Sequence, residues 1–403
     1  MASQSLIYAE LLPNIRQISL AVSLSSPSDA STRVTVTADG ISITLAHHSD
    51  THQLRLPAKV SVGAAALPIQ KQGVTTLSWR LPLDPKCSLA ASATQSQATP
   101  WSATDLKPGS EVSCRECNTV IVSSGAIPVW KDLPSENWAE MMELWHCHKP
   151  EVAGHDSHHH DDAGKADEKG LAARGYGASS TISSQGGVGF VDLTTLLFAE
   201  TDCHGLTFSL SGYEQGSANR QDLAEAESRN LNVCCNSCHA QLGFFNFRTA
   251  AVTLLKWQVS SRSTSTSFPG IPECLAATLI STISRSGSSK SLITPIPEST
   301  AAMATASART STNQAIHIWV LNSGIVYSSS GTAQCTPAVK LLYRLISQDE
   351  ADRMLGGVTC EAQEVNLPRM AISEAIRCLD DSNLLLPSTE RVFKEWRVGL
   401  LRR

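Results

Sequence analysis

Cys114-Arg-Glu-Cys117, followed by Asn118, is the first of two short cysteine motifs in this chain of 403 residues. Two thiols three positions apart can hold one metal ion from a single tight turn, and Asn tolerates the left-handed backbone such a turn needs after its second ligand. Cys235-Asn-Ser-Cys238, followed by His239, repeats the pattern. A structural zinc ion takes four ligands, so the motifs predict one structural zinc site made by Cys114, Cys117, Cys235 and Cys238.

Two other interpretations of these cysteines remain open. Compact zinc modules separate their motifs by about 15–20 residues, whereas more than a hundred residues lie between Cys117 and Cys235. A C-x-x-C motif can be redox-active, and free cysteines are often small buried apolar groups. Cys234, which directly precedes the second motif, is a competing ligand.

The composition argues against several classes of protein. The net charge is −5 and the isoelectric point about 6.2, so nothing indicates a nucleic-acid-binding surface. The first residues lack the form of a signal peptide, and no apolar run approaches the ~18 residues of a membrane span. Twelve cysteines without even spacing fit a reducing compartment better than a disulfide framework. We therefore expect a protein of the cytoplasm, and also of the nucleus, that binds neither nucleic acid nor membranes.

Residues 1–260 are expected to form a β-rich, zinc-containing unit. The segments starting at Val34, Ile41 and Leu54 alternate apolar and polar residues, and Ala38-Asp-Gly40 predicts a hairpin turn between the first two. Without a long helix in this region, an antiparallel sheet or sandwich is the natural solution. Trp138 to Trp145 follow helical spacing and predict a helix packed on the core or an exposed docking face.

A polar, His-rich stretch at about residues 151–187 predicts a disordered insertion, and residues 261–312 predict a Ser/Thr-rich linker. Residues 313–403 predict a C-terminal α+β lobe. It has a strand from Ala315, a hairpin turn at Asn322-Ser-Gly324, a helix over 372–379 and a last helix capped by Ser388. The expected fold is thus α+β and β-rich, with an N-terminal antiparallel sheet or sandwich joined through the split four-cysteine zinc site.

An ordered series of short motifs along the chain resembles a known family. The series is Tyr8-Ala-Glu-Leu-Leu-Pro-Asn-Ile-Arg-Gln, Cys114-Arg-Glu-Cys117, Trp145-His-Cys-His148, Cys235-Asn-Ser-Cys-His-Ala-Gln-Leu-Gly243, Ile318-Trp-Val-Leu-Asn322 and Phe393-Lys-Glu-Trp-Arg-Val-Gly-Leu-Leu401. It is similar to the HECT-like ubiquitin ligases, also called ubiquitin-conjugating-enzyme-binding proteins. The likeness runs nearly end to end, interrupted by the His-rich stretch and the Ser/Thr-rich segment.

The resemblance implies a ubiquitin-protein ligase that binds a ubiquitin-conjugating enzyme and promotes transfer of ubiquitin to lysines of protein substrates and of itself. A HECT-type mechanism needs a cysteine that accepts ubiquitin as a thioester, and such a nucleophile must be reachable and partly thiolate. Cys378 follows Leu367-Pro368 and precedes Leu384-Leu-Leu-Pro387, loosely similar to the HECT pattern, although Arg377 stands where Thr usually precedes the cysteine.

Cys147 is the competing catalytic candidate, because it lies between His146 and His148. Neighbours in sequence do not face one another on a helix, however, and a helix C-terminus disfavours a thiolate. A third possibility is that no cysteine is catalytic, so that the protein is a zinc-stabilised adaptor that binds the conjugating enzyme through the Trp138–Trp145 helix or the segment through Trp257. A C-x-x-C oxidoreductase would instead show a reversible disulfide in place of metal.

Overall fold

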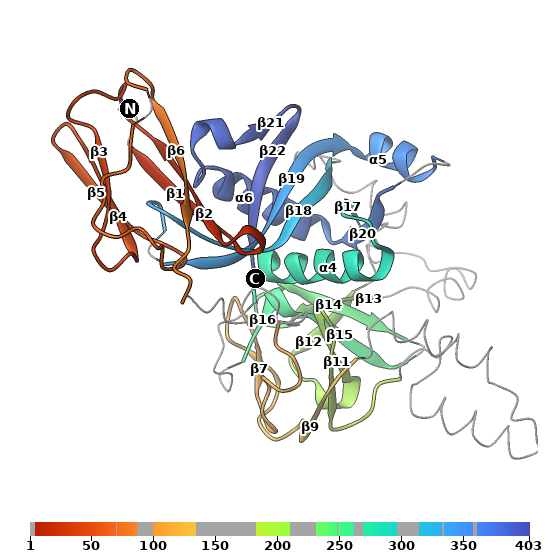
Figure 1. Cartoon of the computed structure of the whole chain (residues 1–403). Coiled ribbons are helices and arrows are strands. Elements are labelled where there is room, and N and C mark those ends of the chain that lie inside the picture. Colours follow the sequence, from red (N-terminus) through yellow and green to blue (C-terminus); the bar gives the residue numbers. More distant parts are fainter. Residues whose placement is uncertain are drawn as a thin grey trace, which may run out of the picture. The chain divides into compact units, whose positions relative to one another are not determined.

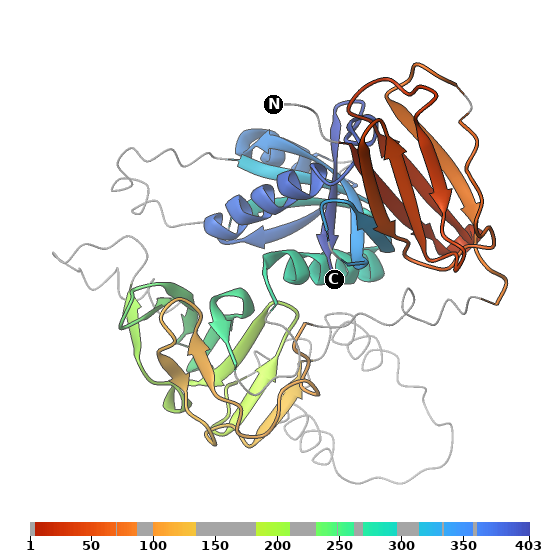
Figure 2. The same cartoon turned by 90° about the vertical axis from the view of Figure 1, so that its left-hand side faces the viewer.

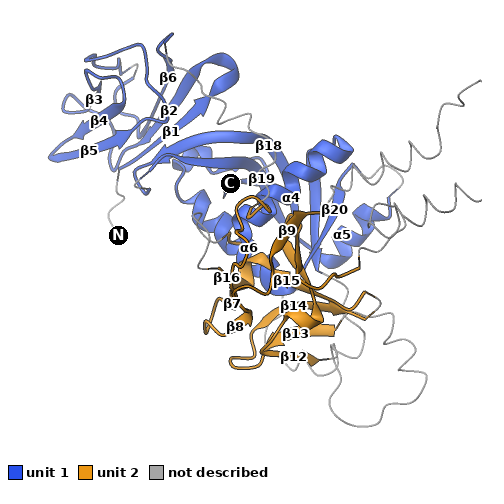
Figure 3. Ribbon diagram, turned by 90° about the horizontal axis from the view of Figure 1, so that it is seen from below, with its two compact units in different colours: residues 1–98, 271–296, 310–403 blue, residues 99–270, 297–309 orange. Residues whose placement is uncertain are grey.

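The computed structural model describes residues 5–69, 71–86, 100–133, 183–209, 231–247, 249–261, 269–295, 314–332, 334–357 and 361–403 (Figure 1). They fall into two compact units, which Figure 3 shows in blue and orange. Unit 1 comprises residues 1–98, 271–296 and 310–403, and unit 2 comprises residues 99–270 and 297–309. Strands predominate over helices in the described residues, which confirms the β-rich α+β class.

The N-terminal part of unit 1 is a sandwich of two antiparallel sheets, as predicted (Figure 2, red and orange). The first sheet includes β1 (Leu6–Leu12), β2 (Gln17–Ser23) and β6 (Thr76–Pro82). The second sheet consists of β3 (Arg33–Val36), β4 (Ser42–His47) and β5 (Asp50–Arg55). Their inward side chains alternate along each strand and form one apolar core, which includes Ile7, Ile18, Leu20, Val34, Ile43 and Leu45.

The predicted hairpin turn at Ala38-Asp-Gly40 joins β3 to β4. Gly40 has φ +70°, and a Cβ there would lie 2.7 Å from the carbonyl oxygen of Val60. Glycine avoids both the strain and the clash, so this residue sets the turn.

The larger sheet of unit 1 contains strands from both ends of the chain. Its described strands follow the order β21-β22-β19-β18-β1-β2-β6, and β17 pairs with both β18 and β20. The C-terminal members are β17 (Lys290–Pro295), β18 (Gln314–Ser329), β19 (Thr336–Ser347), β20 (Gln363–Leu367), β21 (Val392–Phe393) and β22 (Trp396–Arg402). One edge of β18 pairs with β17 near its start and with β1 near its end, so β18 connects the sandwich to the C-terminal strands (Figure 1).

Helices α4 (Ile271–Ser286) and α6 (Arg369–Asn383) cover one face of this sheet. Gly399 on β22 makes the close approach of α6 possible, because a Cβ there would lie 2.7 Å from Leu379 Cδ2. The Tyr343 hydroxyl donates to Asp380 Oδ1 on α6 at 2.6 Å. Trp319, Leu342 and Val398 lie in adjacent register positions and face the opposite side of the sheet, where α5 (Gln348–Leu355) packs near one end.

Unit 2 consists, in its described residues, of a seven-stranded and a three-stranded sheet. The seven-stranded sheet has the order β12 (Leu206–Ser209), β13 (Leu231–Cys235), β14 (Gln241–Asn246), β15 (Ala251–Leu255), β11 (Thr195–Ala199), β10 (Val188–Val191) and β9 (Val129–Asp132). The other consists of β16 (Val259–Ser260), β7 (Val112–Cys114) and β8 (Val120–Val122). Both sheets contribute to one core, which includes Ile121, Leu196, Phe198, Leu242 and Val259.

Three local predictions for the C-terminal half were wrong. Asn322-Ser-Gly324 is not a hairpin turn but an irregularity within β18, because β19 pairs with this strand on both sides of it. The segment 261–312 includes α4 and β17, which are ordered by packing against the sheet although their sequence is rich in Ser and Thr. After Ser388 the chain forms a single 3-10 turn (Ser388–Glu390) and then the β21–β22 hairpin, since β22 is bound by backbone hydrogen bonds to β19.

The two units divide the chain differently from the boundaries expected near residues 260 and 313. Residues 1–98 belong with residues 310–403, because β1 pairs with β18. Both cysteine motifs lie in unit 2. The Trp138–Trp145 segment, Cys147 and residues 151–182 of the His-rich stretch lie outside the described residues. Among the helices that are described, none has the length and apolarity needed to cross a membrane.

Candidate metal centre

Two β-hairpins of unit 2 bring four thiols together. Cys114 and Cys117 lie at the turn between β7 and β8, and Cys235 and Cys238 at the turn between β13 and β14. The Sγ atoms of Cys114 and Cys238 are 3.7 Å apart, and those of Cys117 and Cys235 are 3.6 Å apart. Four sulfurs bound at about 2.3 Å to one tetrahedral ion lie about 3.8 Å from one another. The spacing therefore fits one metal ion and is far too long for disulfide bonds of about 2.05 Å.

The two turns have the same backbone hydrogen bonds. The N–H of Asn118 donates to the carbonyl oxygen of Cys114 at 3.0 Å, and the N–H of His239 donates to that of Cys235 at 2.9 Å. Cys114 N–H donates to Thr119 O, and Cys235 N–H to Ala240 O, at 2.8 and 2.9 Å. The site is thus built from two copies of one local structure, as the repeated motif predicted.

Burial separates the four thiols into two kinds. Cys114 and Cys235 are buried in the core, whereas Cys117 and Cys238 are exposed. Burial raises the pKa of the Cys114 thiol to about 12, while the hydrogen bond with the Thr119 hydroxyl lowers the pKa of Cys117 to about 6. Metal ligands are thiolates, so binding an ion would release protons from this cluster, above all from Cys114.

Arg115 fixes the first turn to the strand beside it, and sequence reasoning did not identify this role. Its guanidinium donates to the carbonyl oxygens of Val259 and Pro269, each at 3.0 Å. Those partners are more than a hundred residues away, so no local pattern marks them. Cys234, considered as a competing ligand, lies in β13 beside the motif but outside the four-thiol cluster.

Lys256 is a second long-range connection in unit 2. It is fully buried, and its Nζ donates to the carbonyl oxygens of Pro100, Trp101 and Asp192. A buried ammonium is tolerated only when its donors are used, so this side chain joins two loops to the end of β15. Trp257, once a candidate for a docking surface, is buried on the 3-10 turn Lys256–Gln258.

Cys378, the catalytic candidate on α6, has surroundings that disfavour a thiolate. It is half-buried, and its Sγ donates to Glu374 Oε1 at 3.7 Å. Burial and the Glu374 carboxylate raise its pKa to about 11. Arg377 is next in sequence, but its guanidinium is engaged with Glu374 and with Asp381.

Unit 1 holds a further cluster, Asp29, His47 and His48. His47 is buried, and its two ring nitrogens hydrogen-bond with Thr32 Oγ1 and Ser26 Oγ, both at 2.9 Å. Because hydroxyl groups occupy both ring nitrogens of His47, we interpret this cluster as a hydrogen-bond network and not as a metal site.

The structure defines a strand-rich α+β protein in which two matching hairpins create one four-cysteine centre. The chain belongs to the HECT-like ubiquitin-conjugating enzyme (E2)-binding family, whose match covers residues 10–398, and the resemblance seen in the motifs is confirmed.

Two curated proteins are similar to this chain, and both are uncharacterised. Protein YJR141W of Saccharomyces cerevisiae is 24% identical over 302 residues, which cover 74% of this chain and 71% of the yeast protein. Protein C1734.10c of Schizosaccharomyces pombe is 43% identical over 53 residues, which cover 12% of this chain and 15% of that protein. No solved structure matches.

Proposed function

We propose that this protein is a ubiquitin-protein ligase that binds a ubiquitin-conjugating enzyme and promotes transfer of ubiquitin to lysines of protein substrates and of itself. The supporting observation is the family match, which spans residues 10–398 and so includes both units and the four-cysteine centre. A protein that depends on free thiols suits the reducing cytoplasm or nucleus, which is where conjugation would take place.

Zinc is the metal that we assign to the four-cysteine centre, in a structural role. Four thiolates in tetrahedral spacing are a donor set typical of structural zinc, and all four positions are filled by protein, which leaves none for a substrate. Cys114, Cys117, Cys235 and Cys238 would hold the ion and so join the β7–β8 hairpin to the β13–β14 hairpin. The ion would supply stability. The redox alternative predicts a disulfide within each motif, whereas Cys114, Cys117, Cys235 and Cys238 are all free in the structure.

The chemical route of transfer has two forms. In the covalent form, a cysteine thiolate of this protein attacks the thioester carbonyl carbon of ubiquitin, and the conjugating enzyme's sulfur leaves and takes up a proton. The neutral amine of a substrate lysine then attacks the new thioester carbonyl: an isopeptide bond to ubiquitin forms, this protein's cysteine sulfur leaves, and the proton lost by the amine passes to that sulfur. Cys378 would first have to lose its proton, which burial and Glu374 oppose. Cys147 lies outside the described residues and stays the competing candidate.

The alternative is a zinc-stabilised adaptor that binds the conjugating enzyme without a covalent intermediate. The raised pKa of Cys378 is the observation on its side, because a protonated thiol at neutral pH is a weak nucleophile. Both proposals require the same partner. They differ in whether ubiquitin is ever bonded to this chain and in whether this chain accelerates its transfer.

A discharge assay distinguishes them. Conjugating enzymes loaded with ubiquitin are mixed with the full chain, and loss of their thioester is followed on non-reducing gels. The ligase proposal expects faster discharge with wild type. A reductant-sensitive ubiquitin adduct lost in Cys378→Ala or Cys147→Ala identifies the covalent form. Binding without faster discharge supports the adaptor. Failure of every conjugating enzyme in a broad panel to bind contradicts both.

A further inference from the structure

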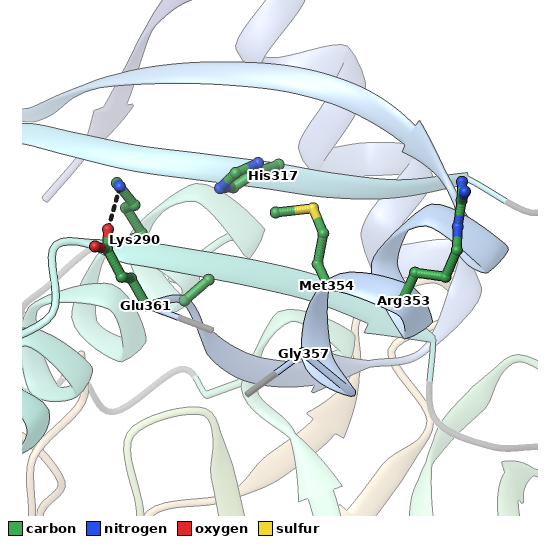
Figure 4. Close-up of a pocket in the computed structure, with 7 residues that line it drawn as sticks. Lys290, His317, Arg353, Met354, Gly357 and Glu361 are labelled. Carbon is green, nitrogen blue, oxygen red and sulfur yellow. Dashed lines mark hydrogen bonds and ion pairs between the residues drawn. The ribbon is translucent and has the colours of Figure 1, made fainter. Parts of the chain in front are cut away.

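Unit 1 contains a pocket of about 360 Å³ on the side of the sheet where α5 packs (Figure 4). Its wall is made by the start of β17, the first part of β18, the end of α5 and the residues before β20. The lining side chains include Lys290, His317, Arg353, Met354, Glu361 and Ala362. This volume is within the usual range for small-ligand sites, about 300–1,000 Å³. Neither the four-cysteine centre nor Cys378 contributes to it.

His317 on β18 lines this pocket and has a buried hydrogen-bond donor that is not used by any described residue. The Arg344 Nε donates to His317 Nδ1 at 3.3 Å, and a guanidinium can only donate, so Nδ1 is the acceptor and Nε2 carries the proton. The side chain is only 5% exposed, and Nε2 has no hydrogen-bond partner among the described residues. Burial, Arg344 and Lys290 lower the pKa of His317 to about 4, so the ring is neutral at neutral pH.

The hydrogen bond from Arg344 and a ring contact with Trp396 hold the His317 ring in place. The His317 ring packs edge-on against Trp396, with ring centroids 4.7 Å apart. Lys290 is held over the Trp319 ring, at 5.8 Å from its centroid. A buried N–H left without an acceptor is costly, and here the ring cannot easily turn to find one.

The charges around the pocket fit a ligand with one negative charge. Lys290 and Arg353 are cations and Glu361 is an anion, so the lining carries one net positive charge. Lys290 Nζ lies 2.5 Å from Glu361 Oε2, and both side chains reach solvent, being 35% and 74% exposed (Figure 4). Glu361 would repel a dianion, while Met354 and Ala362 add apolar wall suited to a short hydrocarbon stem.

We propose that this pocket binds a carboxylate group, with His317 Nε2–H donating to one of its oxygens and Lys290 supplying the opposite charge. The carboxylate belongs to a small organic acid or to the C-terminus of a peptide chain, since both present the same head group on an apolar stem. This site goes beyond the proposed ligase function, and its occupancy is measured without any conjugating enzyme.

Calorimetric titration of the full chain tests the site with acetyl-trialanine bearing a free C-terminal carboxylate, its C-terminal amide, propionate and inorganic phosphate. The free peptide acid should bind at least about tenfold more tightly than the amide, because the amide lacks the carboxylate that accepts the charge-assisted hydrogen bond. Propionate as tight as the peptide acid indicates a small acid as the natural ligand, and a tighter peptide acid indicates a chain terminus. The proposal is overturned by any of three results: the peptide acid and its amide bind equally, neither the peptide acid nor propionate binds, or phosphate binds more tightly than the peptide acid and propionate.

Variants localise the binding. His317→Leu removes the donor and Lys290→Met the charge, and each should weaken binding of the carboxylate probe about tenfold, while His317→Gln, which keeps an N–H donor, should retain more affinity than His317→Leu. Lys394→Met, which removes an exposed cation on the β21–β22 turn, is the matched control and should bind as wild type. If His317→Leu is poorly folded, the affinity of Lys290→Met and the comparison of the peptide acid with its amide still test whether this pocket binds the carboxylate. Unchanged affinity in Lys290→Met overturns the assignment to this pocket.

Discussion

Asn118 and His239 adopt almost the same left-handed backbone conformation, with φ of 59° and 60°. Each lies one position after the second cysteine of its motif, and each N–H donates to the carbonyl oxygen of the first cysteine. Non-glycine residues pay roughly 1–2 kcal/mol for this conformation, and Asn and His are among the types that adopt it most readily. The matched pair shows that the two hairpins are shaped for the same task before any ion is considered.

Metal content is the first prediction. Protein purified without chelator should contain about one zinc ion per chain by elemental analysis, because the four thiols have tetrahedral spacing. Cys235→Ser should lower both the zinc content and the melting temperature, since structural zinc binding is coupled to folding. Cys234→Ser is the matched control: it changes the adjacent thiol outside the cluster and should keep the metal. Metal-free wild type that melts as a folded protein would contradict the site.

Asn118 supports a second prediction, about the turn itself. Asn118→Val should destabilise the protein by about 1–2 kcal/mol in urea unfolding, because a β-branched residue resists positive φ. Asn118→Gly, at the same exposed position, should cost far less, since glycine accepts this backbone freely. Equal losses in both variants would show that the Asn side chain, and not the backbone conformation, matters.

The ion pair between Glu10 and Lys340 is expected to be important for the stability of unit 1. It joins β1 to β19, with Lys340 Nζ 2.6 Å from Glu10 Oε2, and the two side chains are only 19% and 6% exposed. The Tyr8 hydroxyl also donates to Glu10, at 3.0 Å. Lys340→Met leaves a buried carboxylate without its cation and should cost about 3–5 kcal/mol.

The control for that prediction is Lys59→Met. Lys59 pairs with Asp84 in the same unit, but its side chain is 53% exposed, so its loss should cost about 0–1 kcal/mol. Chemical denaturation of the two variants gives the comparison. Similar losses in both would show that burial does not control the strength of the Glu10–Lys340 pair.

The reactivity of Cys378 is predicted to depend on Glu374. Its pKa is raised to about 11, first by burial and then by the Glu374 carboxylate. Glu374→Gln removes a negative charge, so the pKa should fall and the thiolate fraction between pH 7 and 9 should rise. Iodoacetamide labelling of Cys378, followed by mass spectrometry, should then be several-fold faster at pH 8.

Glu395→Gln, an exposed carboxylate on the β21–β22 turn, is the matched control and should label as wild type. In wild type the rate should keep rising with pH up to about 11, the pKa of the thiol. A wild-type rate that already levels off near neutral pH would mean that Cys378 is a ready nucleophile, which would favour the covalent route.

Local sequence carries most of what concerns the metal centre and the sandwich. Cysteine spacing and the residues Asn118 and His239 specify the two turns, because a turn of this kind depends on bonds within six residues. Alternation of apolar side chains in β3 and β4 likewise marks strands with one buried face. The ordered motifs also identify the family, since they extend over nearly the whole chain.

Tertiary structure decided what depends on distant partners. Asn322-Ser-Gly324 has the composition of a turn, yet β19 holds both sides of it in one strand. The Ser- and Thr-rich sequence of α4 is helical because it packs against α6 and β22. The pairing of β1 with β18 arises only when segments hundreds of residues apart meet. The lack of a partner for His317 Nε2 within the described part of the chain likewise depends on which elements pack around it. Backbone polar groups and apolar side chains can be satisfied by any segment that lies close in space. A short window of sequence does not specify which distant segment that will be.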